Sequence, residues 1–222
     1  MQNSDEGLKN TIQSQLFWDA RLDPSAITIH VSSGRVRLSG NVPSYWAKRI
    51  AESDVRAVQG VSDVENNLAV QLPSGIDIPQ DTSIQVSIQS ILAFDPNIDD
   101  ADIEVRVKRG IVTLEGTVPA LWQKDRAEES VLNVQGIRGF VNRIAVVPTV
   151  HYVDELIARD IEAALDRNRK IDVNTVDVQV SDGEVVLSGT VRDQGAGDAA
   201  QEIAKHTDGV VEVTNNLTIN KT

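Results

Sequence analysis

The stretch "GIVTLEGTVPALW", residues 110–122, alternates apolar and polar residues and then changes its pattern after Val118. Alternation is typical of a β-strand with one face in a core, and the later spacing of about 3.6 residues indicates a helix. Closely similar segments occur at residues 34–46, "GRVRLSGNVPSYW", and at residues 183–195, "GEVVLSGTVRDQG". The chain therefore contains three copies of one unit, and this repetition decides the fold.

The three copies align over almost their whole length. A shift of 76 residues places the first copy on the second without a gap, and a further shift of 73 places the second on the third. Each copy reads as an amphipathic helix, a hairpin of two alternating strands, a second helix and a final strand. We predict an α+β fold of three tandem α-β-β-α-β units, each a three-stranded mixed sheet with two helices on one face. The predicted units are residues 5–72, 80–148 and 151–220.

Glycines occupy the same places in every copy. The first is expected to supply positive φ in the hairpin turn. The second stands where a core side chain is expected and indicates a bulge or a close backbone approach, and the third is expected as the C′ residue of the second helix. The three sets are Gly34, Gly40 and Gly60; Gly110, Gly116 and Gly136; and Gly183, Gly189 and Gly209. We also expect Pro43 and Pro119 in the first turn of that helix, with Ser44 and Asp193 as N-caps.

These motifs resemble the BON domain, the module of OsmY-like bacterial proteins. The resemblance is carried by the strand Gly-x-Val-x-Leu-x-Gly-x-Val, the closing Gly-Val-x-x-Val-x-Asn and the amphipathic helices. It covers nearly the whole chain three times, and the third copy departs from it mainly at Gly195 and Gly197. The resemblance implies a role in osmotic or envelope stress, with phospholipid membranes or other proteins as binding partners.

Charge and composition restrict the partners and the compartment. The net charge of −12 argues against nucleic acid, because phosphate binding needs clustered Lys and Arg. The three thirds of the chain, 1–73, 74–148 and 149–222, each carry 7 basic residues but 8, 11 and 14 acidic ones. The sequence has no apolar run of about eighteen residues, so it predicts no membrane span. The polar start "MQNSDEGLKN" lacks a signal pattern and predicts a cytoplasmic protein, or a periplasmic one if an upstream signal has been removed.

No pattern of residues indicates catalysis, a cofactor or a strong metal site. His30, His151 and His206 do not recur between copies and are expected on the surface. The segment "DPNIDDADIE", residues 95–104, partly matches a calcium loop, but it lacks the glycine and glutamate that such a loop needs. Asp99 and its counterparts in the other copies more simply cap turns with their own side chains. We therefore expect no enzyme and no bound metal.

Two pairs of consecutive residues, each ending in a tryptophan and called aromatic steps below, form the candidate interaction site. Tyr45–Trp46 and Leu121–Trp122 begin the second helix of copies one and two, at the margin of its core stripe. Packing between repeats, an external protein partner and a lipid interface all fit such residues. The basic residues beside them, suited to lipid headgroups, are Lys48, Arg49, Lys124 and Arg126. Trp18 and Phe94, at equivalent ends of the first helix, are expected as a partly buried lid on the core.

The absence of a catalytic pattern predicts a non-enzymatic interaction or scaffold protein, and the resemblance to the BON domain implies a place in the bacterial stress response, bound to membrane surfaces or protein partners. A chaperone-like polypeptide-binding protein is one alternative, and a sensor of small ligands or of K⁺ or Ca²⁺ is another. The open edges of a three-stranded sheet would also allow a partner to add a strand.

Overall fold

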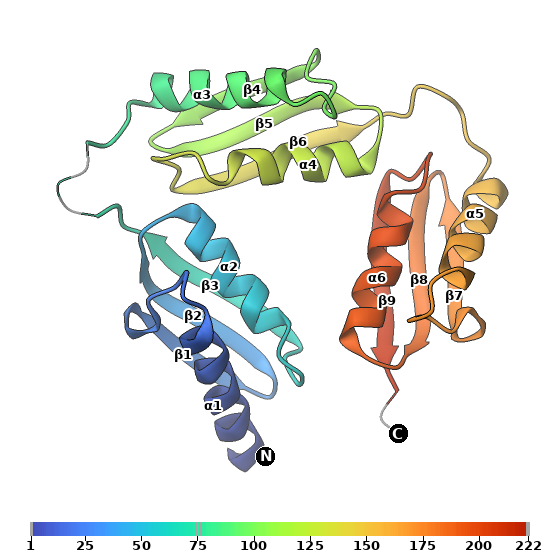
Figure 1. Ribbon diagram of the computed structural model, residues 1–222, viewed down its shortest axis with the longest axis horizontal. Helices are drawn as coiled ribbons and strands as arrows, with labels where there is room; N and C mark the ends of the chain where they lie inside the picture. The colour runs from blue at the N-terminus through green and yellow to red at the C-terminus, as the bar shows by residue number, and fades with distance from the viewer. Residues whose placement is uncertain (1, 74, 76, 221–222) are drawn as a thin grey trace. The chain divides into compact units, whose positions relative to one another are not determined.

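The computed structural model describes residues 2–73, 75 and 77–220 and contains the three predicted α-β-β-α-β units (Figure 1). The first unit consists of α1 (Gln2–Trp18), β1 (Ile27–Ser32), β2 (Arg35–Val42), α2 (Tyr45–Arg56) and β3 (Asp63–Val70). The second consists of α3 (Asp81–Phe94), β4 (Ile103–Lys108), β5 (Ile111–Val118), α4 (Leu121–Val131) and β6 (Gly139–Val146). The third consists of α5 (Asp154–Asp166), β7 (Val176–Ser181), β8 (Glu184–Val191), α6 (Gln194–Lys205) and β9 (Glu212–Ile219). Short 3₁₀ turns, Pro24–Ala26 and Val173–Thr175, precede β1 and β7.

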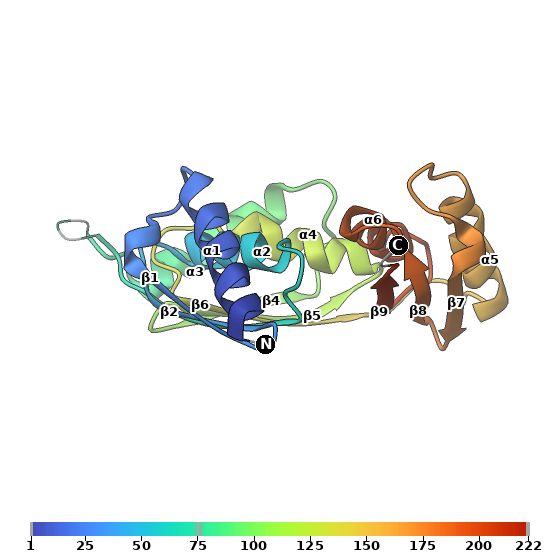
Figure 2. The ribbon, with the colours of Figure 1, turned by 90° about the horizontal axis from the view of Figure 1, so that it is seen from below.

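Each unit has a mixed three-stranded sheet whose central strand is the second of the hairpin. In the first unit β1 pairs antiparallel with β2, and β2 pairs parallel with β3. The third unit repeats this arrangement with β7, β8 and β9. The two helices of the first unit lie on the same side of its sheet (Figure 2), as the one-sided alternation of the strands predicts.

The core of each unit lies between this sheet and its two helices. In the first unit the buried residues are Ile12 and Leu16 of α1, Ala51 and Val55 of α2, and strand residues that include Leu38. Equivalent positions are buried in the other units. No polar or charged residue is fully buried among the residues that the structure describes, so the units are stabilised mainly by apolar burial.

Two of the predicted glycine roles are confirmed by the backbone. Ser33 and Gly34 have φ values of 52° and 79°, which places both central residues of the hairpin turn in the left-handed region. This is the type I′ geometry that matches the twist of the strands. Gly40 pairs with Ile27 across the hairpin, and a Cβ at Gly40 would lie 2.1 Å from the carbonyl oxygen of Ala26. The strand therefore needs glycine at this position.

Three details of the helix ends differ from the prediction. Helix α2 has its C-cap at Ala57, so Gly60 is not the C′ residue but lies in the turn that follows. Helix α6 likewise has its C-cap at His206, before Gly209. Pro43 precedes the N-cap Ser44 and is outside the first turn, because β2 ends at Val42 and α2 begins only at Tyr45. The predicted N-caps are confirmed: Ser44 and Asp193 accept hydrogen bonds from the amides of Ala47 and Ala196 at 3.1 and 2.8 Å.

Candidate interaction site

The Tyr45–Trp46 step begins α2 and is half-buried. The Tyr45 ring lies 6.3 Å from the Phe140 ring with a tilt of 39° between the two planes. The guanidinium carbon of Arg21 lies 5.5 Å from the centre of the Trp46 ring, within the range of a cation–π contact. Both aromatic rings are therefore engaged by other parts of the chain on one side.

The Leu121–Trp122 step begins α4, and its two residues have different surroundings. Leu121 is only 8% exposed and belongs to an apolar cluster that also holds Ala196 and Ala200 of α6. Trp122 is half-buried.

The basic residues predicted beside these steps are partly used within the chain. The Lys48 ammonium donates to the carbonyl oxygen of Leu68 at 2.8 Å, and Arg126 Nε donates to Asp95 at 2.8 Å. Arg49 is exposed and Lys124 is half-buried. Lys48 and Arg126 thus hold elements of their own unit together, which makes their charges less available to a lipid headgroup.

The most exposed aromatic side chains lie elsewhere, at the ends of α1 and α3. Phe17 and Trp18 are 68% and 80% exposed and make an edge-to-face contact at 5.7 Å, and Phe94 is 87% exposed. The prediction of a lid at Trp18 and Phe94 is therefore wrong. Helical geometry explains the error, because each lies two positions after the last core residue, Leu16 or Leu92, and so points away from the core. Arg167 occupies the equivalent position in the third unit.

A cluster of two carboxyl groups and one guanidinium lies between the end of α1 and α2. Arg21 donates to both Asp19 oxygens through its side chain and to Oδ1 through its amide at 2.8 Å. These hydrogen bonds hold the pKa of Asp19 well below its usual range. Burial, together with the neighbouring Asp19 carboxylate, raises the pKa of Asp54 to about 6. No sequence pattern indicates this cluster, because residues 19 and 54 are distant along the chain and the pair occurs in one copy only.

An acidic residue at the start of the first helix fixes the hairpin turn in every unit. Asp154 accepts from the amides of Asp182 and Gly183 at 2.9 and 3.0 Å. Asp81 accepts in the same way from the amides that follow β4, and Asp5 accepts from the amide of Ser33. The aligned repeats contain this signal, since the three aspartates fall in register, but no local motif reveals it.

The described residues hold no group of three His, Cys, Asp or Glu placed to bind a metal ion. In the calcium-like segment Asp95 Oδ1 accepts from the amide of Asn97 at 3.0 Å, while Oδ2 accepts from Arg126. Asp23 and Asp172 accept from amides two residues later, which confirms the predicted turn caps in the first and third copies. At Asp99 the backbone amide instead donates to Gln123 Oε1, and Asp95 is the side chain that caps the turn in the second copy. The three histidines are exposed. Within the described part of the chain, no helix is long and apolar enough to cross a membrane.

The profile of the BON domain matches this chain three times, at residues 4–71, 80–148 and 153–221. The chain belongs to the BON domain family. It is 31% identical over 143 residues to "Osmotically-inducible protein Y" of Escherichia coli (strain K12), which covers 62% of this chain and 71% of that protein. It is 28% identical over 155 residues to "21 kDa hemolysin" of Actinobacillus pleuropneumoniae, covering 68% and 76%. It is also 28% identical over 139 residues to "Outer membrane lipoprotein DolP" of Haemophilus influenzae, covering 62% and 72%.

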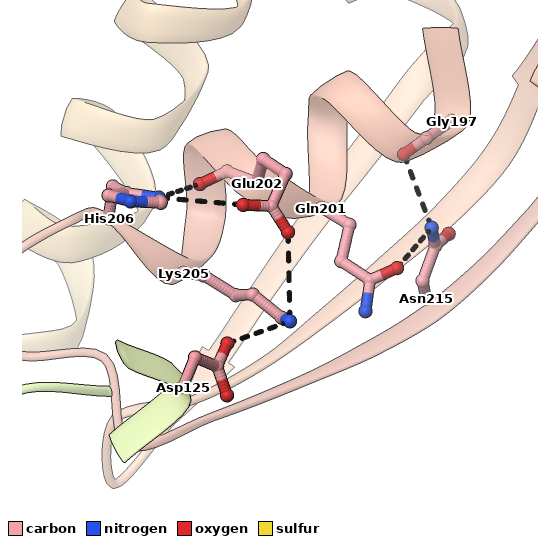
Figure 3. A network of polar contacts seen from close by, with 7 residues as sticks. All are labelled: Asp125, Gly197, Gln201, Glu202, Lys205, His206 and Asn215. Atoms are coloured by element: carbon pink, nitrogen blue, oxygen red, sulfur yellow. Dashed lines mark hydrogen bonds and ion pairs between the residues drawn. The ribbon is translucent and has the colours of Figure 1, made fainter. Parts of the chain in front are cut away.

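The recurring asparagine of the last strand has a structural role in BON domains 1 and 3. In the third domain the Asn215 amide donates to the carbonyl oxygen of Gly197 and to Gln201 Oε1, both at 3.3 Å (Figure 3). Asn66 makes the equivalent contacts in the first, to the carbonyl oxygen of Lys48 and to Glu52. This side chain therefore ties the last strand to the second helix of its domain.

The same view shows an ion pair that links α6 to α4. Lys205 Nζ lies 2.8 Å from Asp125 and 3.7 Å from Glu202 (Figure 3). Burial opposes the charged form of Lys205, but the hydrogen bond and charge of Asp125 outweigh it and raise the pKa of the ammonium group. With Leu121, this pair joins the start of α4 to the third BON domain.

Proposed function

We propose that this BON-domain chain is a non-enzymatic interaction protein of the osmotic or envelope stress response, which attaches to phospholipid surfaces through the aromatic ends of α1 and α3. The observation that carries the proposal is the exposure of Phe17, Trp18 and Phe94 at corresponding places in two domains. Aromatic rings are stabilised at the boundary between headgroups and acyl chains. Folding alone does not require three such side chains in water, because none of them contributes to a core.

The names of two relatives support this setting. One is named for osmotic induction and another as a lipoprotein of the outer membrane. On this proposal the chain works in the cell envelope, and the membrane surface is its main partner. Trp46 and Trp122 contribute less to attachment than Phe17, Trp18 and Phe94, because they are half-buried. On this proposal Arg49, near Trp46, and Lys124, near Trp122, make secondary contacts with lipid headgroups.

Co-sedimentation with phosphatidylcholine–phosphatidylethanolamine vesicles tests the proposal. The triple variant Phe17→Ala, Trp18→Ala and Phe94→Ala is expected to lower the partition coefficient by about tenfold or more for each side chain that inserts, since each buried aromatic side chain contributes about 1.5–3 kcal/mol. Val86→Ala is the matched control, because Val86 is an exposed apolar residue on α3 away from its aromatic end. Equal binding of the wild type and the triple variant would contradict the proposal.

A second candidate partner is a polypeptide that adds a strand to a sheet. Each sheet has the order first, second, third strand, so β1 and β3, and likewise β7 and β9, are edge strands. An edge strand offers unpaired backbone groups to an extended segment. Backbone amide exchange would test this: added partner peptides should protect amides of an edge strand, whereas attachment through helix ends should leave them unchanged.

A further inference from the structure

At the turn after α1 in the first domain, two carboxyl groups lie near a single basic group, Arg21. Asp19 is 11% exposed and its carboxylate is held by Arg21. The carboxyl group of Asp54, on α2, lies close enough to Asp19 for a hydrogen bond when one of the two is protonated. Asp54 Oδ2 is buried and, within the described residues, has no hydrogen-bond partner. Two carboxylates thus face a single guanidinium.

The other two domains avoid this arrangement. By the repeat alignment, Asp95 corresponds to Asp19, and Ser130 takes the place of Asp54. Asp95 has Arg126 as a direct ion-pair partner at 2.8 Å. In the third domain the corresponding residues are Asn168 and Ile203, which carry no charge. The acid pair is therefore a particular feature of the first domain and is not required by the BON fold.

Among the described residues, Arg21 is the one basic group that acts on Asp54. The groups that face it are Asp19 and Arg21, both from the turn after α1. Glu52 and Arg56, its neighbours on α2, pair with each other at 2.9 Å, and Arg49 acts on Glu52. The last turn of α1 has no basic residue, so the negative end of the helix dipole adds to the excess of negative charge around Asp19 and Asp54.

We propose that Asp19 and Asp54 form a proton-operated latch between α1 and α2, closed in acid and loosened at neutral pH. With a proton on Asp54, its hydroxyl donates to the Asp19 carboxylate, and the remaining negative charge is balanced by Arg21. When that proton leaves to water, two adjacent carboxylates repel each other, and one of the Asp54 oxygens is shielded from solvent. The turn then moves away from α2 and withdraws Arg21 from the Trp46 ring.

The latch bears directly on the exposed aromatic end of α1, because Phe17 and Trp18 immediately precede Asp19. A closed latch holds these two side chains in one arrangement, and preorganised contacts bind more tightly than mobile ones. Acid is therefore expected to strengthen attachment through this end. That consequence rests on the proposed function, whereas the latch itself does not.

Tryptophan fluorescence tests the latch without any lipid. Trp18→Phe with Trp122→Phe leaves Trp46, which Arg21 covers, as the single tryptophan. Its emission and its quenching by acrylamide are expected to change in one transition with a midpoint near pH 6. Trp46 should be more accessible to quencher on the alkaline side. Absence of a transition in a folded protein, as judged by circular dichroism, would overturn the proposal.

Two further variants identify the titrating group. Asp54→Asn in the same background should remove the transition and keep Trp46 in its acid-like state, because the amide can donate to Asp19 at every pH. His30→Gln should leave the transition intact, which excludes His30, the histidine of the first domain, as its source in a range where histidines titrate. A transition that persists in Asp54→Asn would overturn the latch.

Vesicle binding separates the latch from the proposed function. Binding to phosphatidylcholine–phosphatidylethanolamine vesicles should be stronger at about pH 5.5 than at about pH 7.5 in the wild type and independent of pH in Asp54→Asn. If Trp46 shows the transition but the wild type binds no vesicles, the proposed function fails and the latch stands. If vesicles bind but Trp46 shows no transition, the latch fails and the proposed function stands.

Discussion

Gly40 shows at the scale of one residue how closely the hairpin approaches its own preceding turn. Its φ is 121°, and an added Cβ would lie 2.1 Å from the Ala26 carbonyl oxygen. Gly40→Ala is therefore expected to destabilise the first domain by about 3 kcal/mol or more, from steric overlap and backbone strain together. Urea unfolding in the Trp18→Phe, Trp122→Phe background, followed by the fluorescence of Trp46, would measure the loss.

Gly7→Ala provides the matched control for that substitution. Gly7 lies within α1, and a Cβ there would meet nothing within 4 Å. Because alanine is the better helix former, this variant should gain up to about 1 kcal/mol. A similar loss in both variants would mean that alanine is tolerated poorly for reasons other than the contact at Ala26.

Asp54 makes the stability of the first domain depend on pH. Its pKa rises from 3.8 to about 6 on folding, so the folded state binds the proton more tightly than the unfolded state. The resulting stabilisation is complete below the unfolded value and is lost as pH rises through the folded one, between about 4 and 6. Asp54→Asn should therefore unfold at a higher temperature than the wild type at pH 7 but not at pH 4.

Asp63→Asn is a control for the loss of an acidic group, since Asp63 is exposed at the start of β3. Its melting temperature should follow the wild type across the same pH range. If Asp54→Asn melts below the wild type at pH 7, the carboxylate of Asp54 stabilises the fold and the predicted sign is wrong.

At the scale of elements, the first helix of each domain is attached to the hairpin by a carboxylate. Asp154 accepts from two turn amides, and its charge makes both hydrogen bonds strong. Asp154→Asn should cost about 1–3 kcal/mol, because one acceptor becomes an amide donor that faces a backbone N–H. Hydrogen exchange at Gly183 and along β8 would report the loss in the third domain.

Asp160→Asn is suitable for comparison, because Asp160 lies on the same helix and is exposed. Faster exchange at Gly183 in this variant as well would indicate a general effect of charge on α5, not a specific attachment of the turn.

These elements also show what could be predicted from the sequence. Strand alternation around Leu38 and helical spacing around Ala51 depend on neighbours along the chain, and both predictions are confirmed by burial. The attachment through Asp154 joins residues 28 and 29 apart, so it depends on the folded topology. The exposure of Trp18 is a matter of helical geometry, because its position two residues after Leu16 turns it away from the core, whereas its aromatic character alone predicts burial.

At the scale of the whole molecule, the net charge of −12 opposes any anionic surface. The acidic residues increase from 8 to 11 to 14 along the three thirds of the chain while the basic ones stay at 7. Attachment by aromatic side chains does not require attraction between charges. The overall charge should therefore make the chain prefer zwitterionic to anionic membranes.

This preference gives a prediction about salt. At low ionic strength, vesicles that contain phosphatidylglycerol should bind less protein than phosphatidylcholine vesicles. Raising the salt to about 1 M shortens the screening length to about 3 Å and should remove the difference. Co-sedimentation of both vesicle types in both salts measures it. Stronger binding to phosphatidylglycerol at low salt would instead show that local basic residues outweigh the overall charge, and Arg49→Glu, on the exposed face of α2, should then abolish the excess.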